Sequence, residues 1–359
     1  MTLPTPRAAV TALPPYVPGR PPTPRPGLTP YKLSSNENPY PPLPGVVEAA
    51  VAQVATMNRY PDLGCTGLYA ALADRLGVAP ESLAAGTGSV AVLYHLLQAY
   101  CETGDEVVYA WRSFEAYPIA VTVTGAASVQ VPVTADGRHD LAAMAAAVGE
   151  RTRVVVLCTP NNPTGPALTH AEVDAFCARM PEHVLVVVDE AYREFVRSED
   201  PVDGVALHRA HARVVVMRTF AKAYGLAGLR VGYALAHPEV AASIRACALP
   251  FGVSSVAQAA AVASLDAEPA LLERVEALVG ERTRVLAALR EQGWDVPDAQ
   301  GNFVWLPVRD HALEVAAAAD EVGLMVRPFA GDGVRVSIGE EPGNTRFLEL
   351  AGRLRGDLG

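Results

Sequence analysis

Hydrophobic residues recur at helical spacing in the part of the chain that follows residue 44. The stretches 45–57, 67–77 and 89–101 keep apolar residues on one helical face and predict three helices. Further along, the pattern changes to short runs that are rich in β-branched residues and almost wholly apolar. These runs cover residues 105–110, 128–133, 153–160, 183–192 and 213–220. Strands that are buried on both faces, as in a parallel sheet, have this pattern.

One stretch between two of these strands returns to helical spacing. Residues 170–180 lie between the runs 153–160 and 183–192, so they predict a crossover helix between strands. Alternating strands and helices are typical of the α/β class. We therefore expect residues 45–255 to form a large domain, with a mostly parallel sheet between helices.

The last third of the chain has a different order of elements. Helices are predicted at 254–267 and 269–293, and after them come strands and one more helix. These later elements cover residues 302–308, 312–323, 324–329 and 333–339. We expect residues 256–359 to form a smaller, C-terminal α+β domain.

Residues 1–44 differ from the rest because they hold nearly half of all the prolines. Proline lacks an amide hydrogen and fits neither the interior of a helix nor a central strand. The segment also lacks the apolar core of a signal peptide. We expect a loose tail or an extended arm that lies against another part of the molecule.

Composition and charge argue against several classes of protein. The 359 residues carry a formal charge of −10 with acidic and basic residues mixed, so no basic patch for a nucleic acid is expected. The five cysteines are widely spaced without a CxxC pair, which argues against a disulfide framework and a zinc site. No apolar run reaches the length of a membrane span. We expect a soluble, cytoplasmic protein with no metal, no nucleic-acid partner and no membrane partner.

Three of the predicted strands end in polar residues that are suited to act on a ligand. The segment "TPNNPTG" follows one strand, "DEAY" follows the next and "TFAK" follows the third. They contain Asn162, Asp189, Tyr192, Thr219 and Lys222. Because ligands bind at the carboxyl ends of strands in an open α/β sheet, we expect these side chains to share one site.

Lys222 suggests the kind of ligand. The chain uses arginine for almost every cation, and Lys32 and Lys222 are its only lysines. A lysine amine can form a Schiff base with an aldehyde, which an arginine cannot. A pyridine aldehyde phosphate would use such an amine. A carboxylate such as Asp189 would keep its ring nitrogen protonated, so that the ring withdraws electrons.

The other residues near the strand ends complete a set for this ligand. Tyr192 and Asn162 suit its ring hydroxyl. Thr219 and Arg230, three residues before the lysine and eight after it, suit its phosphate. Each residue alone would be an ordinary turn, cap or surface group. The three segments together, in this order, indicate a site for pyridoxal 5'-phosphate.

With these motifs in view, the chain resembles the fold-type I pyridoxal-phosphate aminotransferases over nearly its whole length. The segments "NNPTG", "VDEAY" and "TFAKAYGLAGLRVGY" are similar to signature segments of that family. Four others, "PYVPGR", "LSSNENPYPP", "NRYPD" and "GVRVSIG", resemble one branch of it. That branch holds histidinol-phosphate aminotransferases and actinobacterial aromatic amino-acid aminotransferases.

The resemblance implies further contacts with the cofactor. Ser89 and Val90 would offer backbone amides to the phosphate at a helix start, and Phe114 would stack on the pyridine ring. Tyr60 would reach the phosphate of the neighbouring subunit, which implies a homodimer with shared sites. The arm formed by residues 1–44 would pack on the small domain or on the partner subunit.

The resemblance also implies contacts with the substrate. Arg335 would bind the substrate carboxylate through two parallel hydrogen bonds. Asn36 and Asn162 would lie beside that carboxylate, and Tyr16 and Arg327 would line the pocket for the substrate's side chain.

The implied reaction moves an amino group between an aromatic L-amino acid and 2-oxoglutarate, as part of amino-acid biosynthesis. Lys222 would hold the cofactor as a Schiff base and then act as general base, with Asp189 and Tyr192 completing the catalytic set. The kinetics would be ping-pong. Histidinol phosphate, with its phosphate on Arg327, stays open as an alternative substrate. Decarboxylation of a phosphate-bearing amino acid is a more distant alternative.

A nicotinamide-dependent dehydrogenase is the alternative from another class of enzyme. The segment "GTGSVA" matches the pattern GxGxxA, opens a predicted helix and is followed by Asp105 and Glu106. The preceding "PESLAAG" predicts only a poor strand, and this alternative explains neither Lys222 nor "NNPTG". A binding protein without catalysis is less favoured still, because the full catalytic set is present.

Overall fold

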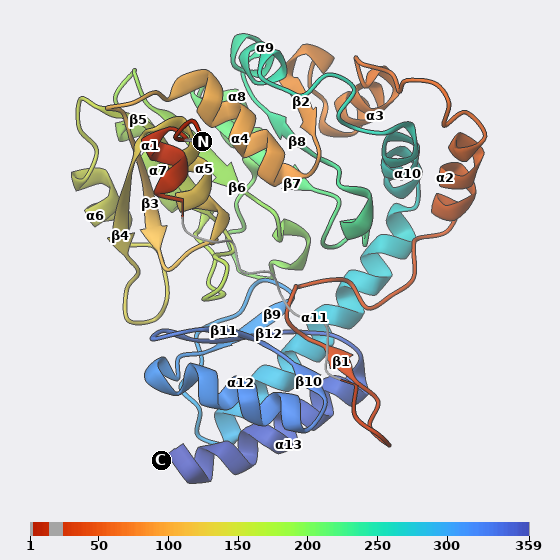
Figure 1. Ribbon diagram of the computed structural model, residues 1–359, viewed down its shortest axis with the longest axis vertical. Helices are drawn as coiled ribbons and strands as arrows, with labels where there is room; N and C mark the ends of the chain where they lie inside the picture. The colour runs from red at the N-terminus through yellow and green to blue at the C-terminus, as the bar shows by residue number, and fades with distance from the viewer. Residues whose placement is uncertain (1–2, 14–23, 359) are drawn as a thin grey trace.

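A central seven-stranded sheet organises the larger part of the molecule (Figure 1). The computed structural model describes residues 3–13 and 24–358. The strands are β2 Leu83–Gly86, β3 Glu106–Trp111, β4 Ala127–Pro132, β5 Thr152–Cys158, β6 Leu185–Asp189, β7 Val214–Thr219 and β8 Gly232–Leu235. They lie in the order β2-β8-β7-β6-β5-β3-β4. β8 runs antiparallel to β2 and β7, and the other neighbours are parallel. The mostly parallel sheet of an α/β protein is therefore confirmed.

Helices cover both faces of this sheet, which explains why its strands are almost wholly apolar. In β6, Val186 and Val188 belong to one hydrophobic core and Val187 belongs to the other. Helix α4 (Ser89–Tyr100) packs on β7 and β8 in the second core. Helix α8 (Gly204–Ala210) packs on β7 in the first core.

Seven further α-helices accompany the sheet. They are α2 Val46–Val54, α3 Thr66–Leu76, α5 Ala116–Thr124, α6 Leu141–Ala146, α7 His170–Arg179, α9 Pro238–Ala246 and α10 Ser255–Asp266, with 3-10 turns at Pro80–Ser82, Arg193–Phe195 and Ala227–Leu229. Helix α7 is the predicted crossover, and its start follows from a capping box in which the side chains of Thr169 and Glu172 bond to each other's backbone amides. In the described part of the chain, no helix combines the length and apolar character that a membrane crossing requires.

The C-terminal part is built around a second, antiparallel sheet. Its strands lie in the order β11-β12-β9, and long helices pack beside it. The elements are α11 Glu268–Glu291, β9 Phe303–Leu306, a 3-10 turn at Arg309–His311, α12 Ala312–Glu321, β10 Leu324–Met325, β11 Arg327–Phe329, β12 Gly333–Ser337 and α13 Glu341–Leu358. Helix α11 runs from the larger part into this one (Figure 1). Helix α10 packs on α2 and α3, so the boundary at residues 255 and 256 stays a prediction.

The described pieces of the proline-rich segment lie against both parts of the molecule. The short helix α1 (Ala8–Thr11) packs on α5, and Arg7 Nη2 donates to the carbonyl of Val123 at 3.0 Å. The two-residue strand β1 (Tyr31–Lys32) pairs in parallel with β10. An extended arm is therefore the better description of these pieces than a loose tail.

One prediction about the strands was wrong. The segment "PESLAAG" predicted a poor strand, yet its last four residues form β2, which is wholly buried. Alanine and glycine give a weak strand pattern, but α4 and α9 pack over β2 and stabilise it. The alternative of a dinucleotide-binding site gains nothing from this strand. Its neighbour β8 is antiparallel, whereas a βαβ dinucleotide unit pairs its strands in parallel.

Candidate active site

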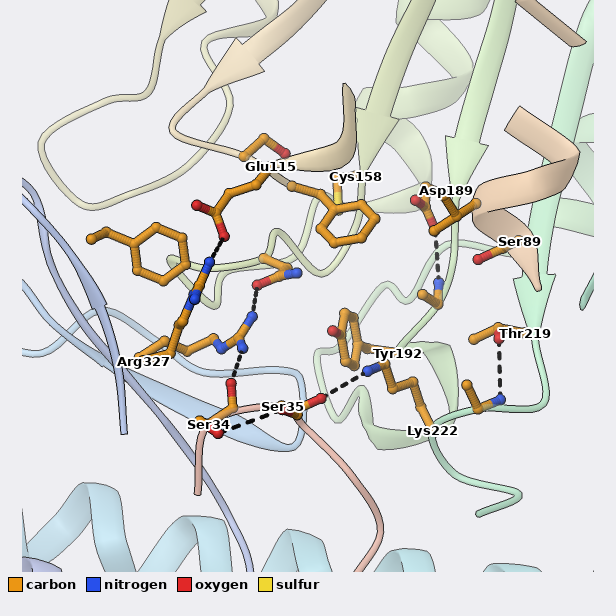
Figure 2. Close-up of a pocket in the computed structure, with 18 of the residues that line it drawn as sticks. Ser34, Ser35, Ser89, Glu115, Cys158, Asp189, Tyr192, Thr219, Lys222 and Arg327 are labelled. Carbon is orange, nitrogen blue, oxygen red and sulfur yellow. Dashed lines mark hydrogen bonds and ion pairs between the residues drawn. The ribbon is translucent and has the colours of Figure 1, made fainter. Parts of the chain in front are cut away.

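The carboxyl ends of the central strands open into a cavity of about 220 Å³ (Figure 2). Strands β11 and β12 of the second sheet close it from the other side. Its lining residues are Ser34, Ser35, Ser89, Val90, Ser113, Phe114, Glu115, Cys158, Asn162, Asp189, Ala191, Tyr192, Thr219, Ala221, Lys222, Arg230, Arg327, Phe329 and Arg335. Eleven of the fourteen residues predicted for the site are in this set, and they come from segments far apart in the chain.

Lys222 lies in the loop that follows β7 and is half-buried at the cavity. Its Nζ donates to the carbonyl oxygen of Ser35 at 3.2 Å and lies 5.6 Å from the centre of the Tyr192 ring (Figure 2). Burial, followed in weight by the positive charge of Arg335, lowers the pKa of this amine to about 7. A large share of the amine is therefore neutral at neutral pH, and a neutral amine can act as a nucleophile or a base.

Asp189 is the last residue of β6, so the strand itself aims its carboxylate at the cavity. Its Oδ2 accepts a hydrogen bond from the Tyr117 hydroxyl at 2.7 Å, and its Oδ1 accepts one from the amide of Ala191 at 3.2 Å. Burial raises the pKa of the carboxyl to about 6, against the opposing effect of the bond from Tyr117. A cationic N–H placed beside Asp189 would favour the carboxylate form.

Tyr192 and Asn36 form a buried pair at the side of the cavity. Asn36 Nδ2 donates to the Tyr192 hydroxyl oxygen at 3.0 Å, and the Ser337 hydroxyl donates to Asn36 Oδ1 at 2.8 Å. Burial raises the pKa of the Tyr192 hydroxyl, which keeps its proton at neutral pH. Asn36 is not among the lining residues, so it orients the phenol from behind within the described structure.

The start of α4 forms an anion cradle with the end of β7. The N-cap residue is Gly88, which has no side chain to satisfy the first amides of the helix, at Ser89 and Val90. Gly88 has a φ of 91°, and a Cβ there would lie 2.5 Å from Arg230 Nη2. The missing side chain thus lets the guanidinium approach the helix start. Together with Thr219, these groups suit a phosphate.

Arg335 projects from β12 into the opposite side of the cavity. It is buried, and it donates to Asn162 Oδ1 at 2.5 Å and to the carbonyl of Ser34 at 2.6 Å. The guanidinium is thereby held in one orientation, which suits a carboxylate ligand that needs two parallel hydrogen bonds.

The loop that carries Asn162 is held by its neighbour Asn161. The Asn161 Oδ1 atom accepts from the Ser113 hydroxyl at 2.7 Å and lies 3.1 Å from His139 Nε2. Its Nδ2 donates to the carbonyl of Arg112 at 3.0 Å. Burial lowers the pKa of His139 to about 4, so this network contains a neutral imidazole. It ties the "NNPTG" loop to the segment that carries Phe114.

Three predicted residues are not brought to the cavity. The side chain of Tyr60 is 83% exposed, and its ring stacks on Phe251 with the centroids 4.7 Å apart. Asn36 lies behind Tyr192, as described above. Tyr16 lies outside the described residues.

Sequence reasoning also missed several residues of the site. Tyr117 and Glu115 were not predicted, although both lie close to Phe114 in the segment "WRSFEAYP". Ser34 and Ser35 directly precede Asn36, and this position next to a predicted site residue could have indicated that they line the cavity. Nothing in the sequence indicates the contact between Arg327 Nη2 and Glu115 Oε2, which are 2.6 Å apart.

Comparisons with known proteins agree with this geometry. The sequence profile described as "Aminotransferase class I and II" matches residues 29–350. The chain is 57% identical over 352 residues to an "Aromatic amino acid aminotransferase" of Streptomyces avermitilis, and the match covers 98% of each chain. It is 55% identical to a protein of the same name from Streptomyces coelicolor, again over 98% of each.

A solved structure resembles the whole molecule. The histidinol-phosphate aminotransferase of Sinorhizobium meliloti, in complex with pyridoxal-5'-phosphate, superposes with a TM-score of 0.89 and 27% identity. The match covers 98% of both chains. From the profile, the relatives and the fold together, we conclude that this chain belongs to the family of class I and II aminotransferases.

Proposed function

We propose that the protein is a pyridoxal-phosphate-dependent aminotransferase that moves an amino group between an aromatic L-amino acid and 2-oxoglutarate. One observation carries the proposal. The cavity holds a half-buried amine with a pKa of about 7, at Lys222, together with a buried carboxyl at Asp189 and a buried guanidinium at Arg335.

The residues of the cavity fit pyridoxal 5'-phosphate group by group. Lys222 suits the aldehyde, and Asp189 suits the ring nitrogen. The backbone amides of Ser89 and Val90 at the start of α4, with Thr219 and Arg230, suit the phosphate dianion. The remaining contacts fall to Tyr192 and Asn162 for the ring hydroxyl and to Phe114 for the face of the ring. When bound, the cofactor supplies an electron sink for the bonds of the substrate's α-carbon.

The protein's own residues would then divide the work of the reaction. Arg335 binds the substrate carboxylate and fixes the position of the α-carbon. Lys222 Nζ takes the α-proton as general base, a role that suits an amine with a pKa near neutral pH. Asp189 holds a proton on the ring nitrogen, and the Tyr117 hydroxyl holds the Asp189 carboxylate in place.

Support for an aromatic substrate comes from two sources. The relatives with more than half of their residues identical carry the name aromatic amino acid aminotransferase. The aromatic rings of Phe114 and Phe329 line the cavity. Histidinol phosphate remains the second candidate substrate, because the structural neighbour at 27% identity carries the name histidinol-phosphate aminotransferase and Arg327 lines the cavity.

We also propose a homodimer in which Tyr60 reaches the partner's phosphate cradle. Tyr60 stacks on Phe251, and the chain around it, from α2 to Leu63, also exposes Val47, Val51, Val54, Met57 and Leu63. Exposed apolar surface, where it is contiguous, marks protein interfaces. In this proposal the described arm residues keep their contacts with both parts of the molecule, α1 with α5 and β1 with β10, and the predicted split into residues 45–255 and 256–359 is kept. The cytoplasm is the proposed compartment, for which the five free thiols are the support.

A half-reaction tests the enzymatic proposal. Purified protein loaded with pyridoxal phosphate is mixed with L-phenylalanine, and phenylpyruvate is measured at one equivalent per site or less. We expect near-stoichiometric product with the natural protein and none with Lys222→Arg, since a guanidinium cannot replace the amine. Equal product from that variant would refute the role of Lys222. Faster conversion of L-histidinol phosphate than of L-phenylalanine would assign the protein to the second substrate.

A further inference from the structure

Two arginines stand side by side on the wall of the cavity. Strands β11 and β12 are antiparallel, and Arg327 lies directly opposite Arg335 in their register. Residues opposite each other in such a pair carry their side chains on the same face of the sheet. Both side chains line the cavity, so two positive charges face the substrate from neighbouring strands. Like charges in this position repel each other unless a carboxylate offsets one of them.

Glu115 supplies that carboxylate. It precedes α5 in the large part of the molecule, and its Oε2 lies 2.6 Å from Arg327 Nη2 (Figure 2). The Arg327 side chain is 9% exposed, whereas that of Glu115 is 30% exposed. The guanidinium is therefore fixed by its surroundings, while the carboxylate lies at the edge of the cavity and can turn toward solvent.

A second ion pair of the same kind shows what is special about Glu115. Arg112 Nη2 lies 2.5 Å from Asp332 Oδ2, and the guanidinium lies 5.6 Å from the centre of the Phe329 ring. Arg327 lies 5.5 Å from the same ring. Neither Arg112 nor Asp332 lines the cavity in the described structure, whereas both members of the other pair do.

We propose that Glu115 is a specificity-determining residue that sorts substrates by the charge of their side chains, an inference that rests on the proposed aminotransferase function. An uncharged aromatic side chain leaves the pair of Glu115 and Arg327 intact. A side-chain carboxylate, as in 2-oxoglutarate, replaces Glu115 on Arg327 one for one. A phosphate monoester brings about two negative charges beside Glu115, and Arg327 can balance only part of them.

Glu115→Gln tests this inference, because glutamine has nearly the same shape without the charge. The initial rates of the half-reaction are compared for L-phenylalanine and for L-histidinol phosphate as functions of concentration. We expect kcat/KM for the phosphate ester to rise by about tenfold or more relative to that for phenylalanine. Asp332→Asn is the matched control, since it removes a carboxylate from an arginine beside Phe329 outside the cavity, and it should leave the ratio unchanged.

Equilibrium binding separates this inference from the proposed reaction. The acids 3-phenylpropionate and 3-phosphonopropionate lack an amine, so their dissociation constants can be measured by calorimetry without turnover. Glu115→Gln should tighten binding of the phosphonate selectively, with the aromatic acid changed by about twofold or less. Selective tightening supports the inference even if phenylalanine is not a substrate. An unchanged ratio, or the same change in Asp332→Asn, overturns it.

Discussion

At the scale of single residues, burial brings the titration of the two central groups close to neutral pH. Lys222 has a pKa of about 7 instead of 10.5, and Asp189 has a pKa of about 6 instead of 3.8. Removing a charge from water is unfavourable, so burial shifts the amine down and the carboxyl up. Each group is therefore near the point at which a bound ligand changes its charge.

The titration of Lys222 can be measured without a cofactor. Brief acetylation of the cofactor-free protein over a range of pH, read by mass spectrometry, reports the neutral fraction of each lysine. Because the pKa is lowered, Lys222 should gain reactivity as pH rises through about 7. The peptide that carries Lys32 serves as the internal reference for the amount of reagent. A midpoint near 10.5 would contradict the burial argument.

Removal of the Tyr117 hydroxyl should weaken the charge on Asp189. The bond from Tyr117 lowers the pKa of that carboxyl, so Tyr117→Phe should raise the pKa and leave more Asp189 protonated at neutral pH. One hydrogen bond to a charged group is worth about 2 kcal/mol, so we expect about a thirtyfold loss in kcat. The visible spectrum of the loaded protein should also change with pH at a higher midpoint.

Tyr109 provides the control for that experiment. It is buried beside Tyr117, with the ring centroids 5.7 Å apart, and its hydroxyl accepts from Gln130 at 3.1 Å. Tyr109→Phe removes a buried hydroxyl without touching Asp189. If both variants shift the spectrum alike, the effect belongs to packing and the role given to Tyr117 is wrong.

At the scale of elements, the anion cradle depends on a glycine at the start of a helix. Gly88→Ala would set a Cβ against Arg230 and strain a backbone with positive φ. We expect affinity for pyridoxal phosphate to fall by about tenfold to a hundredfold, measured by equilibrium titration. Gly104→Ala is matched for strain, with a φ of 103° and open space at its Cβ. It should lose stability without losing affinity, and equal losses in both variants would refute the cradle.

The same scale explains what the sequence could and could not predict. Strands β5, β6 and β7 have strong apolar patterns, so the sequence alone predicts the polar site residues at their carboxyl ends. Strand β2 has only alanine and glycine beyond its leucine, and its burial under helices cannot be read from its own pattern. The partners Tyr117 with Asp189 and Glu115 with Arg327 are 72 and 212 residues apart in sequence. Such contacts depend on how the elements are packed together.

At the scale of the whole molecule, the position of Tyr60 predicts behaviour in mixed assemblies. If Tyr60 serves the partner's site, Tyr60→Ala and Lys222→Ala are each inactive alone but complement each other. Random exchange of subunits in a 1:1 mixture should restore about a quarter of the natural activity. A mixture that exchanges subunits, as shown by light scattering of tagged chains, yet stays inactive would place Tyr60 outside the partner's site.

The cavity lies along a seam between the two parts of the molecule, and polar contacts cross that seam at several points. Arg335 reaches Asn162, Arg327 reaches Glu115, and Lys222 reaches the carbonyl of Ser35. In the proposed reaction, a substrate carboxylate on Arg335 would compete with the bonds that already hold that guanidinium. Substrate binding would therefore be coupled to the relative position of the two parts. A ligand would shift that position by replacing bonds that now join one part to the other.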